Sequence, residues 1–252
     1  MRKSCFLRGA SGFSAPRPSF ISRLLVVSLV TGLSTARLLH AAPPPPADVA
    51  LAVVYDTSGS MRVPIKAADG RLAPKNLIAQ RAFGLVIDRL ERFTRPASDA
   101  AASAKRLDLS IVIFNGSRAV TAVPMAPFNA ASTRSWLGAL PIPDSGTPLG
   151  DAMSLAARSL LATPAASKHL LVLTDGENTL GSSPLAALTA LQKQTQTQNQ
   201  TVFVHVIALD IPPAVFASLQ KAGATLIGAA DEKQLQSQLD FILENQILVE
   251  AP

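Results

Sequence analysis

Residues 49–60 read VALAVVYDTSGS, and this stretch decides the fold class of the chain. Its first seven residues are apolar without alternation, which is typical of a strand buried on both faces of a sheet. Asp56 follows at once, and with it come the hydroxyl side chains of Thr57, Ser58 and Ser60. Taken alone, these residues predict either a turn whose hydroxyls bond the local backbone or a set of metal ligands.

The rest of the chain alternates apolar runs with segments of helical spacing. Strands are predicted at 49–55, 107–114, 120–124, 168–174, 201–209 and 225–227. Helices are predicted at 77–93, 131–140, 149–161, 184–194, 213–222 and 231–243. This alternation predicts an α/β fold with a doubly wound, mostly parallel, Rossmann-like central sheet flanked by helices.

Three aspartates, Asp56, Asp175 and Asp210, each come directly after a predicted strand. Because such sheets bind ligands beyond the carboxyl ends of their strands, we expect all three at one edge of the sheet. Asp210 is expected to stand behind the residues that contact a ligand. The two histidines on strands are expected to be structural, with His205 inside the sheet or core and His169 exposed at a strand start.

Three separated pieces of sequence share the pattern of a known family: DTSGS at 56–60, SGTPLGDA at 145–152 and LTDGEN at 173–178. Together they resemble the von Willebrand factor A (VWA) domain with a complete metal-ion-dependent adhesion site (MIDAS), in a bacterial exported form. The family motif is Asp-x-Ser-x-Ser after the first strand, a Thr in a later loop and an Asp after a central strand. The five matching residues here are Asp56, Ser58, Ser60, Thr147 and Asp175.

The resemblance implies a site for Mg²⁺, with Mn²⁺ or Ca²⁺ as alternatives. Mg²⁺ is a hard ion that takes oxygen ligands and keeps several waters. We expect the hydroxyls of Ser58, Ser60 and Thr147 to bind the metal directly, and Asp56 and Asp175 to act through water. The last ligand would be an Asp or Glu of a partner protein. The absence of Cys and His near the motif argues against zinc.

Each piece of the motif also has a structural interpretation. Thr147 followed by Pro148 is a good helix start, and Thr147 can serve as ligand and N-cap together. Asp175 begins an Asp-Gly pair that is common in turns. Asp151 falls in the first turn of a predicted helix, where an acidic side chain is favourable. Thr57 is expected to point away from the metal.

Residues 61–75, MRVPIKAADGRLAPK, are predicted to form an ordered loop beside the metal, with a turn at Asp69-Gly70. We hypothesise that three basic residues of this loop form a rim that favours acidic ligands, with Glu177 as a further rim residue. The three basic residues are Arg62, Lys66 and Arg71. The alternative is a solvated surface loop with no role in binding.

The chain is expected to have four parts: a signal peptide or uncleaved anchor at 1–41, a proline-rich linker at 42–47, a VWA domain at 48–245 and a C-terminal tail at 246–252. The first part has a basic start, an apolar stretch at 24–33 and then small residues, which is the order of a secretory signal. The apolar stretch is shorter than the about 20 residues of a membrane-spanning helix. We therefore expect a periplasmic or secreted protein, without stable membrane insertion if the leader is cleaved.

The net charge of +6 comes from the predicted leader. Six of the 23 basic residues lie within 1–41, which has no acidic residue, so 17 basic residues face 17 acidic residues in the remainder. This balance gives no support for nucleic-acid binding. The only cysteine, Cys5, also lies in the leader, so the mature domain is expected to fold without disulfides.

The leading hypothesis is a non-enzymatic, metal-dependent module that binds a protein in adhesion or envelope assembly. The first alternative is a Mg²⁺-dependent hydrolase or phosphatase-like enzyme, but aspartyl phosphatases need a second Asp at the position of Ser58. The sequence also lacks the G-x-S-x-G elbow and the G-x-G-x-x-G fingerprint. The second alternative is an accessory subunit of an AAA-type ATPase system, which the leader disfavours because such partners work in the cytosol.

Overall fold

The computed structural model describes residues 47–96, 104–144 and 146–249. The predicted leader, most of the linker and the last three residues of the predicted tail lie outside these ranges. None of the helices in the described part of the chain combines the length and the apolar character needed to cross a membrane.

The apolar run Val49–Tyr55 forms strand β1, all of whose residues are buried, near the middle of a six-stranded sheet. The other strands are β4 (Leu107–Asn115), β5 (Arg118–Pro127), β6 (Ser167–Thr174), β7 (Phe203–Leu209) and β8 (Thr225–Ala229). Their order is β5-β4-β1-β6-β7-β8, and every pairing is parallel except that of β5 with β4. The predicted fold class, a doubly wound and mostly parallel α/β sheet, is confirmed.

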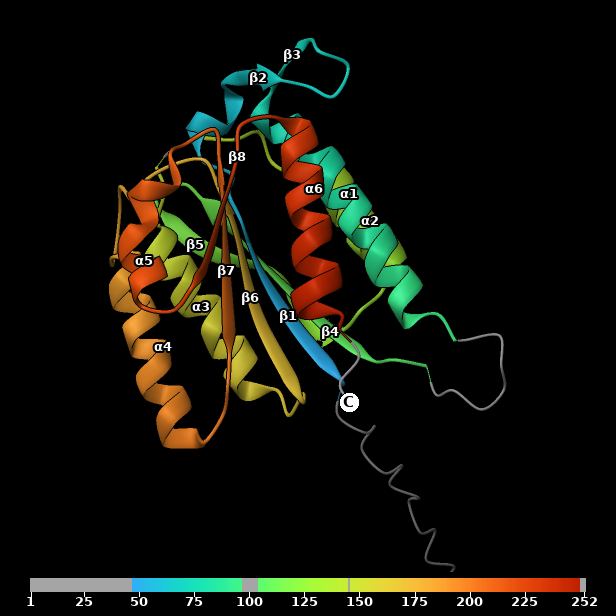
Figure 1. Cartoon of the computed structure of the whole chain (residues 1–252), viewed down its shortest axis with the longest axis vertical. Coiled ribbons are helices and arrows are strands. Elements are labelled where there is room, and N and C mark those ends of the chain that lie inside the picture. The colour runs from blue at the N-terminus through green and yellow to red at the C-terminus, as the bar shows by residue number, and fades with distance from the viewer. Residues whose placement is uncertain (1–46, 97–103, 145, 250–252) are drawn as a thin grey trace, which may run out of the picture. The chain divides into compact units, whose positions relative to one another are not determined.

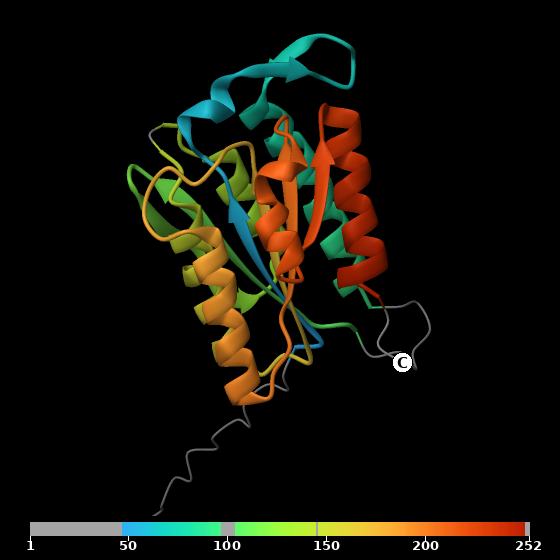
Figure 2. The same ribbon diagram turned by 60° about the vertical axis from the view of Figure 1, so that its left-hand side comes forward.

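Helices cover both faces of this sheet, as Figures 1 and 2 show. The first face carries α1 (Lys75–Thr94), α2 (Ala130–Gly138) and α6 (Glu232–Ile242), followed by a π-helical turn, η3 (Leu243–Ile247). The second face carries α3 (Leu149–Ala162), α4 (Pro184–Gln198) and α5 (Ala217–Lys221), the last preceded by the 3-10 helix η2 (Pro213–Phe216). Alternate residues of β1 therefore enter two separate cores.

Helix α1 forms because apolar residues recur every four positions along its inner side. Ile78, Ala82, Val86 and Leu90 are all buried against the sheet. At the upper end of this core, Tyr55 makes edge-to-face ring contacts with Phe83 and Trp136, with centroid distances of 5.6 and 5.9 Å. Such aromatic pairs contribute about 0.5–1.5 kcal/mol beyond their buried area. They fix β1, α1 and α2 to one another just below Asp56.

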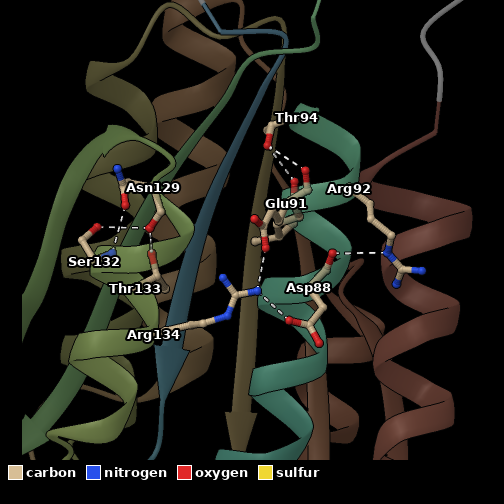
Figure 3. A network of polar contacts seen from close by, with 9 residues as sticks. Asp88, Glu91, Arg92, Thr94, Asn129, Ser132, Thr133 and Arg134 are labelled. Carbon is tan, nitrogen blue, oxygen red and sulfur yellow. Dashed lines mark hydrogen bonds and ion pairs between the residues drawn. The ribbon is translucent and has the colours of Figure 1, made fainter. Parts of the chain in front are cut away.

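Helix α2 is held to α1 by a polar network on the surface (Figure 3). The guanidinium of Arg134 donates to Asp88 at 2.7 Å and to Glu91 at 2.6 Å. Asn129 caps α2 by accepting a hydrogen bond from the backbone N–H of Ser132 at 2.9 Å. Because these charges are exposed, solvent screens them and each pair contributes little to stability. The network orients α2 more than it stabilises the fold.

The segment between β1 and α1 forms a hairpin that stands above the carboxyl ends of the parallel strands (Figures 1 and 2). A 3-10 helix, η1 (Gly59–Arg62), leads into β2 (Pro64–Lys66), which pairs antiparallel with β3 (Leu72–Pro74). The predicted turn at Asp69-Gly70 is confirmed, and Gly70 has φ 87°, where only glycine is unstrained. The two short strands were not predicted.

Three sequence-based expectations about other parts of the sheet and its helices are wrong in detail. Strand β5 runs to Pro127 rather than ending at 124, because its prolines lie on an edge strand where a missing N–H is tolerated. The helix expected at 213–222 divides into η2 and α5. His169 is 2% exposed rather than solvent-facing, because Phe203 and His205 stack on its ring from β7.

Candidate metal centre

Asp56 directly follows the carboxyl end of β1 and is fully buried. One carboxylate oxygen, Oδ1, accepts the backbone N–H of Ser58 at 2.7 Å. The other, Oδ2, accepts the hydroxyl of Thr174 at 2.6 Å, from the last residue of β6. The sequence contained no signal for Thr174, whose role follows from the pairing of β1 with β6. These two bonds fix the orientation of the carboxylate.

The two serines of the motif bridge Asp56 and Asp175. The Oγ atoms of Ser58 and Ser60 lie 3.0 Å apart, and Ser60 donates to Oδ1 of Asp175 at 2.7 Å. The neighbouring Thr57 points the other way, as expected, since its hydroxyl donates to the carbonyl of Phe114 on β4 at 2.7 Å. In this loop Ser58 and Ser60 therefore face the candidate site, whereas Thr57 bonds the neighbouring strand.

Thr147 joins the same cluster from the loop before α3. A Cβ placed on Gly176 would lie 3.6 Å from Ser60 Oγ and 3.7 Å from Thr147 Oγ1, so both hydroxyls face this glycine. Reciprocal bonds hold the Thr147 backbone: its N–H donates to Thr179 Oγ1 at 2.8 Å, and the N–H of Thr179 donates to its carbonyl at 3.0 Å. The structure thus brings all five predicted residues to one edge of the sheet.

The expected capping role of Thr147 is wrong. Pro148 occupies the N-cap position of α3 and makes no side-chain cap, while the N–H of Gly150 is satisfied by Asn178 Oδ1 at 3.1 Å. Asp151 does lie in the first turn of α3, where its carboxylate accepts the backbone N–H of Ser182 at 3.0 Å. The loop after β6 thus takes over the capping, which leaves the Thr147 hydroxyl for the site.

The predicted rim residues lie on two segments around this cluster. Arg62, Lys66 and Arg71 are exposed on the hairpin that rises at the same edge of the sheet. Glu177 is exposed in the loop that follows Asp175. Their side chains are therefore accessible to a partner that approaches the cluster.

A lysine outside the predicted set of site residues also enters the cluster. Lys75, the first residue of α1, is 5% exposed, and its Nζ lies 2.9 Å from Oδ2 of Asp175 and 3.2 Å from Oδ2 of Asp210. Burial opposes its charge, but the two carboxylates outweigh burial and raise the pKa of Lys75, so it stays an ammonium. Asp210 shares the edge with Asp56 and Asp175, as predicted.

The donor set fits a hard divalent cation. Burial, and next the negative charge of Asp175, raise the pKa of Asp56 to about 6, so the cluster favours added positive charge. Asp175 Oδ2 is buried, and its partner within the described residues is the Lys75 ammonium at 2.9 Å. Three neutral hydroxyls beside two carboxylates are oxygen donors of the kind that Mg²⁺, Mn²⁺ and Ca²⁺ take.

The cluster is not a site of the His, Cys or polycarboxylate type. Within the described part of the chain, no group of three or more His, Cys, Asp or Glu side chains is placed to hold a metal ion. Fold and site together define a Rossmann-like α/β domain with an oxygen-rich cluster at the carboxyl edge of its sheet. The family model for the von Willebrand factor type A domain matches residues 50–238, and the chain belongs to this family.

Solved structures with the same fold come from bacteria and from an animal. The PilB minor pilin of Streptococcus sanguinis is 15% identical, with a TM-score of 0.59, over 80% of this chain and 62% of the pilin chain. The von Willebrand factor domain of the type V pili tip protein of Porphyromonas gingivalis is 12% identical, with a TM-score of 0.57, over 79% of this chain and 94% of that chain.

The third structure is proximal thread matrix protein 1 from the mussel byssus, with a zinc-occupied MIDAS motif. It is 13% identical, with a TM-score of 0.56, over 79% of this chain and 48% of the mussel chain. This chain therefore spans less than two thirds of the minor pilin and of the mussel protein. No curated protein matches the chain in sequence.

Proposed function

We propose that the chain is an exported, metal-dependent protein-binding module whose cation completes its coordination with a carboxylate of the partner. The observation that carries the proposal is the convergence of three separate loops on one cluster. Ser60 donates to Asp175 at 2.7 Å, and the hydroxyl of Thr147 faces the same glycine as that of Ser60. A turn that only satisfied its own backbone would not bring these loops together.

In this proposal Ser58, Ser60 and Thr147 would hold the cation directly, and Asp56 and Asp175 would hold its waters. We propose Mg²⁺ as the resident ion, with Mn²⁺ or Ca²⁺ as alternatives, because the donors are all oxygens. The mussel protein holds zinc in its MIDAS motif, so zinc belongs among the ions to be tested. A bound divalent ion would act as a Lewis acid toward a partner carboxylate.

The partner is proposed to be a protein that presents Asp or Glu. The exposed Arg62, Lys66 and Arg71 would raise the local concentration of acidic surfaces and steer their approach. Two structural relatives are pilus proteins, which supports a role in adhesion or envelope assembly. Together with the predicted signal peptide at 1–41, these relatives support a proposed site of action in the periplasm or outside the cell.

Binding without catalysis is part of the proposal. The buried carboxylate of Asp56 is similar to the nucleophile of Mg²⁺-dependent phosphatases, but two positions on stands Ser58, which cannot act as a general acid at neutral pH. We therefore expect no phosphatase turnover on generic substrates. Metal-dependent turnover that is lost in Asp56→Ala would overturn this part of the proposal.

The test of the proposal has two stages. Calorimetric titration of the mature domain with Mg²⁺, Mn²⁺, Ca²⁺ and zinc should show one bound ion per chain, and absence of binding would contradict the site. Pull-downs from envelope extract should then recover a partner with metal but not with EDTA, and not with Asp56→Ala. Equal recovery in all three samples would reject metal-dependent binding.

The basic rim has its own test. Replacing Arg62, Lys66 and Arg71 by Gln should reduce the association rate with an acidic partner and weaken its dependence on salt, because rim charges act mainly on the encounter. Metal affinity should change far less than partner affinity. Unchanged association kinetics would show that the three basic residues have no role in binding and that the hairpin is a solvated surface loop.

A further inference from the structure

Lys75 is a buried cation placed inside a site that is proposed to bind another cation. Its side chain is 6% exposed, and its Nζ lies 2.9 Å from the fully buried carboxylate of Asp175. Asp175 is one of the five residues proposed to hold the metal, and the Lys75 ammonium is the partner of its buried Oδ2 in the described part of the chain. The lysine thus supplies the positive charge that Oδ2 faces in the metal-free chain.

Helix stability does not explain this lysine. Lys75 is the first residue of α1, where the helix dipole disfavours a positive charge. Burial of an ammonium group costs further free energy unless it is paired. The hairpin nevertheless fixes this position, since the N–H of Lys75 donates to the carbonyl of Val63 at 3.0 Å. The buried ammonium of Lys75 is therefore stabilised by the two carboxylates that it faces.

A second carboxylate lies on the far side of the ammonium. Asp210 Oδ2 is 3.2 Å from Nζ, and its side chain is 39% exposed, in contrast to the fully buried Asp175. Asp210 follows β7 and has φ 55°, the left-handed region in which a non-glycine residue is strained. Its N–H donates to the carbonyl of Ala229 at 2.7 Å, which helps to hold this conformation. Lys75 thus has one partner inside the cluster and one at its margin.

We infer that Lys75 is a built-in counter-ion that competes with the divalent cation for Asp175 and so sets the metal affinity of the site. Without metal, the ammonium neutralises Asp175 and spares the fold an unpaired buried carboxylate. When a cation is bound near Asp175, repulsion weakens the Lys75–Asp175 pair, while Asp210 keeps the ammonium in place. This inference rests on the proposed function, since it concerns the affinity of the same site.

The competition has a consequence for the partner. With a divalent ion present, the buried groups Asp56, Asp175 and Lys75 leave one net positive charge, which Asp210 balances only in part because it is 39% exposed and screened by solvent. An additional carboxylate removes this excess, so metal and acidic partner should strengthen each other's binding. Because the lysine weakens binding of the metal alone, the site would be filled chiefly when a partner carboxylate is available.

Calorimetric titration with Mn²⁺ tests the inference on three proteins: the wild type, Lys75→Met and Lys193→Met. Lys193 is an exposed lysine on α4 and is not one of the proposed site or rim residues, so its replacement makes the same change in net charge without touching Asp175. We expect Lys75→Met to bind Mn²⁺ at least about 10-fold more tightly, since a unit charge a few ångströms from a divalent ion repels it strongly even at high effective dielectric. Lys193→Met should stay within about two-fold of the wild type, because its charge is exposed and screened.

Asp210→Asn gives a second, independent variant. Without Asp210 the ammonium has Asp175 as its remaining carboxylate, so Mn²⁺ affinity should fall by about 3- to 10-fold. In the Lys75→Met background the same substitution should have a smaller effect, which a double-mutant cycle measures. Thermal unfolding in EDTA supplies a readout without metal: Lys75→Met should melt below the wild type, and Mn²⁺ should raise its melting temperature by more.

The outcomes separate the two claims. One outcome would overturn the counter-ion role but not the metal site: the wild type binds Mn²⁺, Lys75→Met binds it equally or more weakly, and the effects in the double-mutant cycle are additive. Absence of Mn²⁺ binding in every variant would overturn the proposed function and the inference with it. Binding by Lys75→Met but not by the wild type would support both.

Discussion

The two ends of β6 bury polar side chains in opposite ways. At the carboxyl end lie Asp175 and the neighbouring Asp56, two carboxylates that burial and mutual repulsion disfavour. Near the amino end lie His169 and His205, whose rings stack with centroids 5.4 Å apart and share a hydrogen bond of 3.1 Å. Both groups are almost fully buried in the same sheet.

The difference between these two regions lies in charge. The histidines are neutral: they bond each other, and His169 also bonds the hydroxyl of Ser167 at 2.7 Å, while Nδ1 of His205 is buried without a hydrogen-bond partner in the described residues. The carboxylates stay charged and require a cation, which in the described chain is Lys75. Burial of polar groups alone therefore does not indicate a binding site, whereas a buried excess of one charge does.

The largest expected difference between the two ends concerns metal binding. Asp175→Asn should lower the affinity for Mn²⁺ by about 10- to 100-fold, the usual loss when a residue that orients a metal's ligands is removed. His169→Gln and the surface variant Asp88→Asn should leave the affinity unchanged. Calorimetric titration measures all three, and a similar loss in His169→Gln would contradict the assignment of the metal to the carboxyl end.

The amino end should make the protein sensitive to acid. Burial, and then the charge on the neighbouring ring, lower the pKa of His169 to about 3, and burial lowers the pKa of His205 to about 4. Both values lie below the ordinary 6.5, so the unfolded chain binds more protons and stability falls as the pH drops from 6.5 toward 4. Between pH 7 and pH 5 the loss should be on the order of 2 kcal/mol for each of the two histidines.

Urea unfolding at both pH values measures this loss. In the variant His169→Gln, His205→Gln the difference between pH 7 and pH 5 should shrink, while the contributions of carboxylates remain in both proteins and cancel. An unchanged pH dependence in the variant would show that the histidines do not carry the acid sensitivity. The comparison is made in EDTA, so that metal binding at the carboxyl end does not enter.

A smaller effect is expected at the anchor of the hairpin. Glu232, at the start of α6, accepts the backbone N–H of Ala68 at 2.8 Å and two bonds from Arg81 at 2.7 and 2.8 Å. Glu232→Gln should cost about 1–2 kcal/mol of stability, because the carboxylate is buried although Arg81 is half exposed. Glu244→Gln, which removes an exposed partner of Arg89, is the matched control and should cost less than about 1 kcal/mol.

The smallest effect is expected at Tyr55, the last residue before Asp56. Its hydroxyl is buried and has no hydrogen-bond partner in the described part of the chain. Tyr55→Phe keeps the ring contacts with Phe83 and Trp136 and removes the unsatisfied group, so stability should rise by about 0.5–1 kcal/mol. A clear loss of stability on chemical denaturation would instead show that the hydroxyl has a stabilising partner.

The sheet could be predicted from the sequence because its parallel strands are continuous apolar runs that end at polar residues. Asp56 and Asp175 could be found for the same reason, since they follow such runs directly. Ser58 and Ser60 are equally typical of a turn, and Thr147 follows no predicted strand, so these three required the resemblance to the family. The assignment of these five residues to a metal stays a proposal.

Residues that depend on contacts between distant segments could not be predicted. Lys75 is the last residue of the predicted loop 61–75, and its ion pair with Asp175 joins segments that are far apart in the sequence. The capping role expected of Thr147 was wrong because Asn178, from another loop, satisfies the first turn of α3. His169 was expected to be exposed at the start of its strand. This was wrong because Phe203, a residue of the neighbouring strand, stacks on its ring.

The most direct test of the central claim is a crystal structure of the mature domain grown with Mn²⁺, in which anomalous scattering locates the ion. We expect one Mn²⁺ at the carboxyl edge of the sheet, about 2.0–2.3 Å from the hydroxyl oxygens of Ser58, Ser60 and Thr147. Asp56 and Asp175 should lie behind bound waters. A cluster without Mn²⁺ at saturating concentration, or an ion held elsewhere on the domain, would contradict the central claim.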